Sequence, residues 1–124
     1  MDRMLVVFQV AEASLISSNQ WLVRGRVLQK IQVGDTVYSI RGKGIAVISE
    51  SSSDDTYAVP SETEPPPELY PFVVVGARYA GRELDALYRM QAGGLVLQGE
   101  EGKVLEDTKL LIRNEWRVFE KAIC

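Results

Sequence analysis

The chain has 124 residues, of which 46% are hydrophobic and 25% are charged, and its formal net charge is −3. This length and composition suit one globular domain, residues 1–124, and the charge excludes a domain that is basic as a whole, as many nucleic-acid-binding domains are. The sequence has no histidine, which excludes Ser-His-Asp and Cys-His catalysis, and its single cysteine leaves no zinc site built on His and Cys.

The same counts bear on where the protein works. Cys124 has no partner for an internal disulfide, which favours a reducing compartment. The apolar run from Met4 to Val10 is too short for a secretory signal, and no stretch approaches the ~20 apolar residues of a membrane helix. We therefore expect a cytoplasmic protein that binds no membrane and whose terminal thiol is inert.

In chain order, short apolar runs alternate with turn residues, a pattern that predicts β-strands. We expect these strands over residues 4–10, 21–30, 36–41, 44–49, 70–84, 95–100 and 109–112. Gly25 interrupts the second strand and is typical of a bend at a barrel corner. By contrast, Leu84, Leu87 and Tyr88 are spaced as on one face of a helix and predict a short helical insert. Residues 114–124 fit either a helix or a strand.

The segment from residue 51 to residue 68 differs from the rest in composition. It is rich in Ser, Pro, Asp and Glu, and it contains no Lys or Arg. Such a segment has little apolar surface to bury, and its like charges repel one another. We expect a mobile acidic loop or lid that lies outside the barrel but within the domain, rather than a folded hairpin.

Taken together, the strands, the short helix and the acidic loop predict an all-β fold, a small antiparallel Greek-key-type β-barrel. Its glycines and valines also follow a known order: Gly25-Arg26-Val27, then Ile31, Val33-Gly34-Asp35 and Val37, and later Phe72–Val75, Gln91-Ala92-Gly93, Leu95–Leu97 and Gly99. This order resembles the second domain of translation GTPases of the elongation factor Tu type, over residues 5–112 apart from the acidic loop.

The resemblance implies a barrel and not an activity. In translation factors this barrel contacts ribosomal RNA or the acylated tRNA end, but this chain has no GTPase domain, and the acidic loop is not a feature of that family. Within the shared motif we interpret Val33-Gly34-Asp35 as a turn between strands, in which Gly34 leaves the backbone bare, Asp35 hydrogen-bonds the turn, and Val33 and Val37 supply core contacts.

Residues with catalytic potential are few. The chain has no phosphate-binding G-x-x-x-x-G-K-[ST] loop, and its carboxylate pairs are best interpreted as solvated surface acids: Asp54-Asp55, Glu83 with Asp85, and Glu100-Glu101. We therefore expect no enzyme, no cofactor and no metal site.

Two groups of arginines are more suggestive. Arg24 and Arg26 are two residues apart on one strand and share a face, and Arg78 and Arg82 flank Tyr79. An arginine pair beside an aromatic ring can clamp a phosphate or a carboxylate, although exposed arginines on a barrel also serve solubility alone.

The sequence therefore predicts a non-enzymatic binding module that acts through protein–protein contacts, as an inhibitor, an immunity-type protein or an adaptor. We expect its contacts at Arg78, Tyr79, Arg82, Asp54 and Asp55. The alternative is an RNA- or ribosome-associated accessory factor, which the net charge disfavours and which requires five basic residues to cluster: Arg24, Arg26, Lys43, Arg78 and Arg82. A small-molecule site inside the barrel is a third hypothesis.

Overall fold

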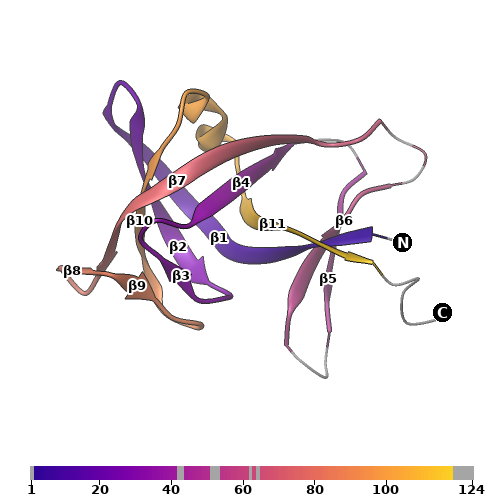
Figure 1. The fold of residues 1–124 in the computed structure, drawn as a ribbon, viewed down its shortest axis with the longest axis horizontal. Coiled ribbons are helices and arrows are strands. Elements are labelled where there is room, and N and C mark those ends of the chain that lie inside the picture. The colour runs from indigo at the N-terminus through magenta and orange to yellow at the C-terminus, as the bar shows by residue number, and fades with distance from the viewer. Residues whose placement is uncertain (1, 42–43, 51–53, 62, 64, 119–124) are drawn as a thin grey trace.

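The computed structural model describes residues 2–41, 44–50, 54–61, 63 and 65–118. Within them, six antiparallel strands close a β-barrel (Figure 1). These strands are β1 (Asp2–Ser17), β2 (Gln20–Val27), β4 (Thr36–Arg41), β7 (Glu68–Tyr79), β10 (Ala92–Gln98) and β11 (Leu110–Val118). Their order around the barrel is β1-β2-β10-β7-β4-β11, and β11 returns to pair with β1.

This order confirms the predicted fold class. β4, β7 and β10 lie side by side in sequence order, and β11 then crosses back to lie beside β4, which is the Greek-key arrangement. Closure leaves no free edge within the barrel itself. None of the helices in the described part of the chain is long and apolar enough to cross a membrane.

The packing of β1 explains its unbroken apolar run. Leu5 and Val7 belong to the main core with Trp21 from β2, while Met4 and Val6 face a second cluster on the other side of the strand. A register irregularity between Val6 and Phe8 places Phe8 in the main core as well. Both faces of β1 are therefore buried from Met4 to Phe8.

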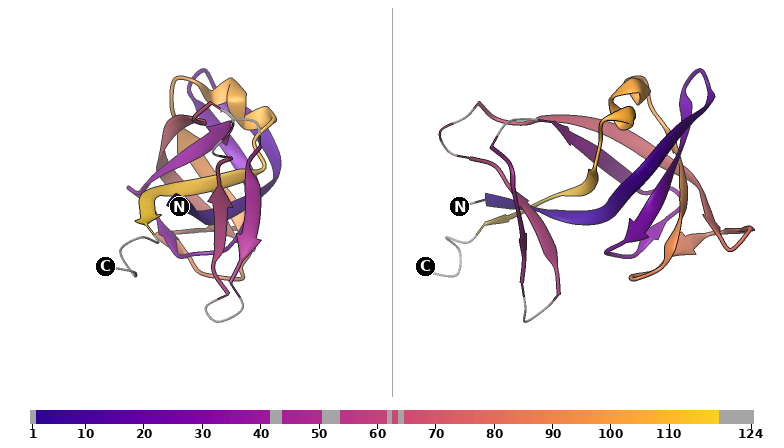
Figure 2. Two further views of the ribbon diagram at one scale, coloured as in Figure 1. Left: turned by 90° about the vertical axis from the view of Figure 1, so that its right-hand side faces the viewer. Right: turned by 180° about the vertical axis from the view of Figure 1, so that it is seen from behind.

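Within the segment from residue 51 to residue 68, the expectation of one loop is wrong for part of its length. Thr56–Val59 form β6, which pairs with β5 (Ala46–Ser49) and with Met4 and Leu5 of β1. The reason is that Tyr57, Ala58 and Val59 bring enough apolar surface to be buried against β1. The resulting β5–β6 hairpin projects from one end of the barrel, beside the start of β1 (Figure 2). Ser51–Ser53, Glu62 and Glu64 lie outside the described residues.

The helical insert expected around Leu84–Tyr88 is also wrong. That stretch is extended and forms β8 (Arg82–Leu84) and β9 (Ala86–Leu87). β8 pairs with β7, and β9 pairs with β3 (Ile31–Gln32). Leu87 is fully buried in this pairing, while Tyr88 is 54% exposed, so the apolar residues do not share one face.

A single turn of 3-10 helix, η1 (Gly102–Glu106), occurs instead between β10 and β11. Leu105 of η1 is fully buried in the main core. Gly102 lies so close to Trp21 that a Cβ there would be 2.0 Å from the indole nitrogen, and η1 therefore rests directly on the Trp21 ring.

The turn at Val33-Gly34-Asp35 has the structural role that its residues predicted. Gly34 has a φ of +100°, which favours glycine, and the Asp35 carboxylate accepts a hydrogen bond of 3.0 Å from the backbone N–H of Gln32. Val37 is buried, as expected, but Val33 is 42% exposed and so contributes little to the core. At the other end of the chain, the strand alternative is correct through Val118, and residues 119–124, including Cys124, lie outside the described part.

Candidate anion-binding groove

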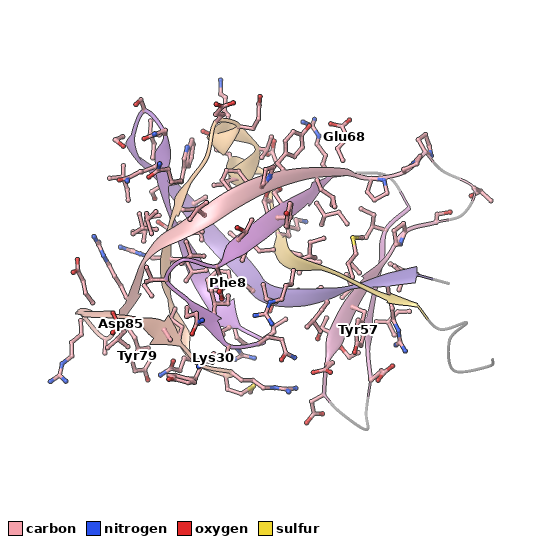
Figure 3. The ribbon with its side chains drawn as sticks, viewed as in Figure 1. Phe8, Lys30, Tyr57, Glu68, Tyr79 and Asp85 are labelled. Atoms are coloured by element: carbon pink, nitrogen blue, oxygen red, sulfur yellow. The ribbon has the colours of Figure 1, made fainter. Side chains whose placement is uncertain are left out.

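An open groove of about 980 Å³ crosses the outside of the barrel wall. One wall is β2, which contributes Arg24 and Arg26; the other is the β7–β8 hairpin, which contributes Arg78, Tyr79 and Arg82. The sequence singled out both arginine groups separately, and the fold brings them together. Tyr79 lies at the β8–β9 end of the molecule, far from Tyr57 in the β5–β6 hairpin (Figure 3).

Strand alternation explains why Arg24, Arg26 and Arg78 face outward. On β2, Val23 and Val27 are fully buried, so Arg24 and Arg26 point to the other face, where both are exposed. On β7, Ala77 is buried and Arg78 is exposed in the same way. The hydrophobic pattern of each strand thus fixes the side on which its arginines lie.

The strand register places the two walls on either side of β10. Gly94 of β10 is paired with Arg24 on one side and with Arg78 on the other. Ala92, two residues earlier on the same face, is paired with Arg26. The strand between the arginines therefore carries only a hydrogen atom and a methyl group on this face, and these form the floor of the groove together with the Leu22 side chain, which packs beside Gly94.

The turn between β7 and β8 sets the position of Arg82. Ala80 and Gly81 connect the strands with φ values of +52° and +77°, the combination that a two-residue type I′ hairpin requires. Arg82 is thereby paired with Tyr79. A positive φ is uncommon for alanine, so the hairpin stores some backbone strain next to the groove.

The groove carries a strong local charge in an acidic protein. Four arginines line it against one carboxylate, Glu83. Within the described part of the chain, Arg24, Arg26, Arg78 and Arg82 make no side-chain hydrogen bond or ion pair, whereas Arg3 and Arg89 both do. The four guanidinium groups are therefore available to an anion from outside, and Lys43 lies outside the described residues.

The two aspartates predicted as contact residues lie elsewhere. Asp54 and Asp55 belong to the β5–β6 connection, where Asp55 accepts a hydrogen bond of 2.5 Å from Gln29 and forms an ion pair of 3.5 Å with Arg89. Arg89 also donates to the backbone carbonyl of Asp54, at 2.5 Å. The Asp55 carboxylate thus anchors the hairpin to the barrel, and it does not share a surface with Tyr79.

Sequence reasoning missed the floor of the groove. The signal was present in Ala92-Gly93-Gly94, three small residues at the start of a strand, which often mark a close approach of another group to the backbone. Among the described residues, no group of three or more His, Cys, Asp or Glu side chains could hold a metal ion.

The chain matches no protein-family model, no curated protein and no solved structure. The arrangement of the groove itself is therefore the basis for assigning a function.

Proposed function

We propose that the protein is a non-enzymatic binding module and that its arginine groove binds RNA. The observation that carries this proposal is the convergence of Arg24, Arg26, Arg78 and Arg82 on one groove, without internal partners among the described residues. Phosphate oxygens are the acceptors that such guanidinium groups bind best, often through two parallel hydrogen bonds.

Two further features support RNA as the source of the phosphates. The groove is open to solvent and spans β2, β10 and the β7–β8 hairpin, so it has room for more than one phosphate, and the residue order resembles barrels that contact RNA in translation factors. The net charge of −3 is no obstacle, because the field at a groove depends on the local charges within about 10 Å. The net negative charge also limits RNA binding elsewhere on the surface.

The test is RNA binding by fluorescence anisotropy with a labelled single-stranded oligonucleotide. Replacing Arg24 with glutamate should weaken the affinity at least about tenfold, because one charge-assisted hydrogen bond contributes roughly 1.5–3 kcal/mol. The matched control is Arg41→Glu, since Arg41 is exposed on β4 and does not line the groove.

Three results would contradict the proposal. They are an affinity that does not fall with added KCl, equal losses for Arg24→Glu and Arg41→Glu, and the absence of RNA binding at low salt. Tighter binding of an acidic peptide than of RNA would assign the groove to a protein partner instead.

A second observation favours protein contacts at a different place. Among the described residues β5 ends the strand order and pairs with β6 alone, and Val47 and Ile48 on it are 55% and 43% exposed. An apolar edge strand of this kind can accept a strand from a partner. A partner recovered from the native host should be lost with Val47→Pro while RNA binding is retained; a partner that binds this variant normally does not use β5.

A further inference from the structure

We infer that the groove holds a single phosphodiester strand lying along β10, and that it rejects double-stranded nucleic acid. This inference rests on the proposed function and names the form of nucleic acid that fits. Three features carry it: two tiers of arginines, an uncharged floor between them, and a carboxylate on the outer side of Arg24 and of Arg78.

The tiers follow from the strand register. Arg24 and Arg78 flank Gly94 in the first tier. In the second tier Arg26 is paired with Ala92, and Arg82 lines the groove from the β7–β8 hairpin. The tiers are two residues apart along the strands, or about 7 Å. This separation suits successive phosphates of an extended strand, whereas the phosphates of a nucleoside diphosphate share one oxygen and lie much closer together.

The floor decides how near a phosphate can come. Arg24 and Arg78 are two strands apart, or about 10 Å between their backbones, so both side chains can reach an anion centred over β10. Gly94 and Ala92 bring only a hydrogen atom and a methyl group to that space, but the Leu22 side chain packs beside Gly94, with its Cδ1 3.1 Å from where a Cβ would stand. A phosphate of the first tier can therefore lie between Arg24 and Arg78 above the Leu22 side chain.

The carboxylates of Glu12 and Glu83 limit the width of the nucleic acid that the groove can hold. Across the first tier the register continues outward from Arg24 to Glu12 on β1, and from Arg78 to Glu83 on β8. Both acids are exposed. A single strand centred on β10 stays between the arginines, but the second strand of a duplex would bring its phosphates over Glu12 or Glu83, where like charges repel.

Tyr79 adds a contact that only an unpaired base can use. It is 39% exposed at the end of the groove, and an exposed aromatic ring can stack on the face of a base that is free of its partner. Tyr79→Ala should weaken the binding of a single strand roughly tenfold and leave any residual duplex binding unchanged.

The experiment compares a single-stranded RNA with a duplex of the same sequence by anisotropy, in the wild type and in the Glu12→Gln/Glu83→Gln double variant. The wild type should bind the single strand at least about tenfold more tightly, and the double variant should gain affinity for the duplex and reduce this preference. Glu100→Gln/Glu106→Gln is the matched control, because both acids are exposed and lie outside the groove.

The salt dependence of the RNA affinity gives the number of phosphates that the groove holds. The slope of log Kobs against log[KCl] should be about −1.4 if two phosphates are held, compared with about −2.8 if each arginine binds its own. Equal binding of both forms, or no response of duplex affinity to the Glu12/Glu83 variant, would overturn the single-strand inference alone. The steeper slope would overturn the arrangement of one phosphate per tier. Failure to bind any RNA would overturn the proposed function with it.

Discussion

Gly25 lies where β2 packs closely against β1, and its substitution tests how tightly these two strands of the barrel wall are packed. A Cβ on residue 25 would lie 1.8 Å from the backbone oxygen of Gln9 and 3.1 Å from the Phe8 ring. Neither neighbour can rotate away, because one is backbone and the other is a fully buried side chain. In Gly25→Ala, β1 and β2 must therefore move apart by more than about 1 Å in a close-packed wall.

The size of the effect follows from two contributions. Overpacking of a core costs about 1–3 kcal/mol, and the disturbance of one or two ladder hydrogen bonds adds about 1 kcal/mol each. We expect Gly25→Ala to lower the free energy of unfolding by about 2–5 kcal/mol. Urea denaturation followed by far-UV circular dichroism measures this directly.

Gly94→Ala is the control, on a neighbouring strand of the same wall. There the nearest atom to a new Cβ is the Cδ1 end of Leu22, at 3.1 Å, and this side chain can shift. The lower entropy of the unfolded chain contributes about 0.4–1 kcal/mol in favour of alanine, so the free energy of unfolding should change by less than about 1 kcal/mol. If Gly25→Ala is as stable as the wild type, or if both variants lose equally, the close contact of β1 and β2 at this point is wrong.

Three further predictions concern single contacts. Ser39 and Thr108 are both buried, with their hydroxyl oxygens 2.6 Å apart, and Thr108 donates to the carbonyl of Val104. Thr108→Val should therefore lower the free energy of unfolding by about 1–3 kcal/mol in urea denaturation, and Ser39→Ala/Thr108→Val should lower it less than Thr108→Val alone; an equal or larger loss in the double variant would contradict this. Ala80→Gly should raise the free energy of unfolding by up to about 1 kcal/mol, because glycine adopts the positive φ without strain. The control Ala92→Gly, within β10, should lower the free energy of unfolding; if both variants are less stable than the wild type, the β7–β8 turn is unstrained. The hydrogen bond from the Tyr70 hydroxyl to Glu68 raises the pKa of Tyr70 above its usual 10.0. This contact therefore favours the folded state below pH ~10 and is lost as the pH rises through the raised pKa. An ultraviolet pH titration of Glu68→Gln should show a lower Tyr70 pKa than the wild type, and an unchanged value would exclude the contact.

Much of the fold could be predicted because it depends on local patterns. The alternation of Trp21, Val23 and Val27 placed one face of β2 in the core, and the geometry of Gly34 and Asp35 followed from turn chemistry. The errors came where short apolar runs fit two structures. Leu84, Leu87 and Tyr88 have helical spacing, but pairing with β3 and β7 outweighed that weak local preference.

For the groove, the sequence identified the arginines that line it but not how they are arranged. It determined by itself that Arg24 and Arg26 share a face, that Arg78 and Arg82 flank a tyrosine, and that histidine chemistry is absent. Only the tertiary structure decided that β10 lies between β2 and β7 and that Gly94 stands in line with Arg24 and Arg78. The physical reason is that strand order and register are set by burying the apolar faces of segments far apart in the chain, and no local pattern encodes which strands become neighbours.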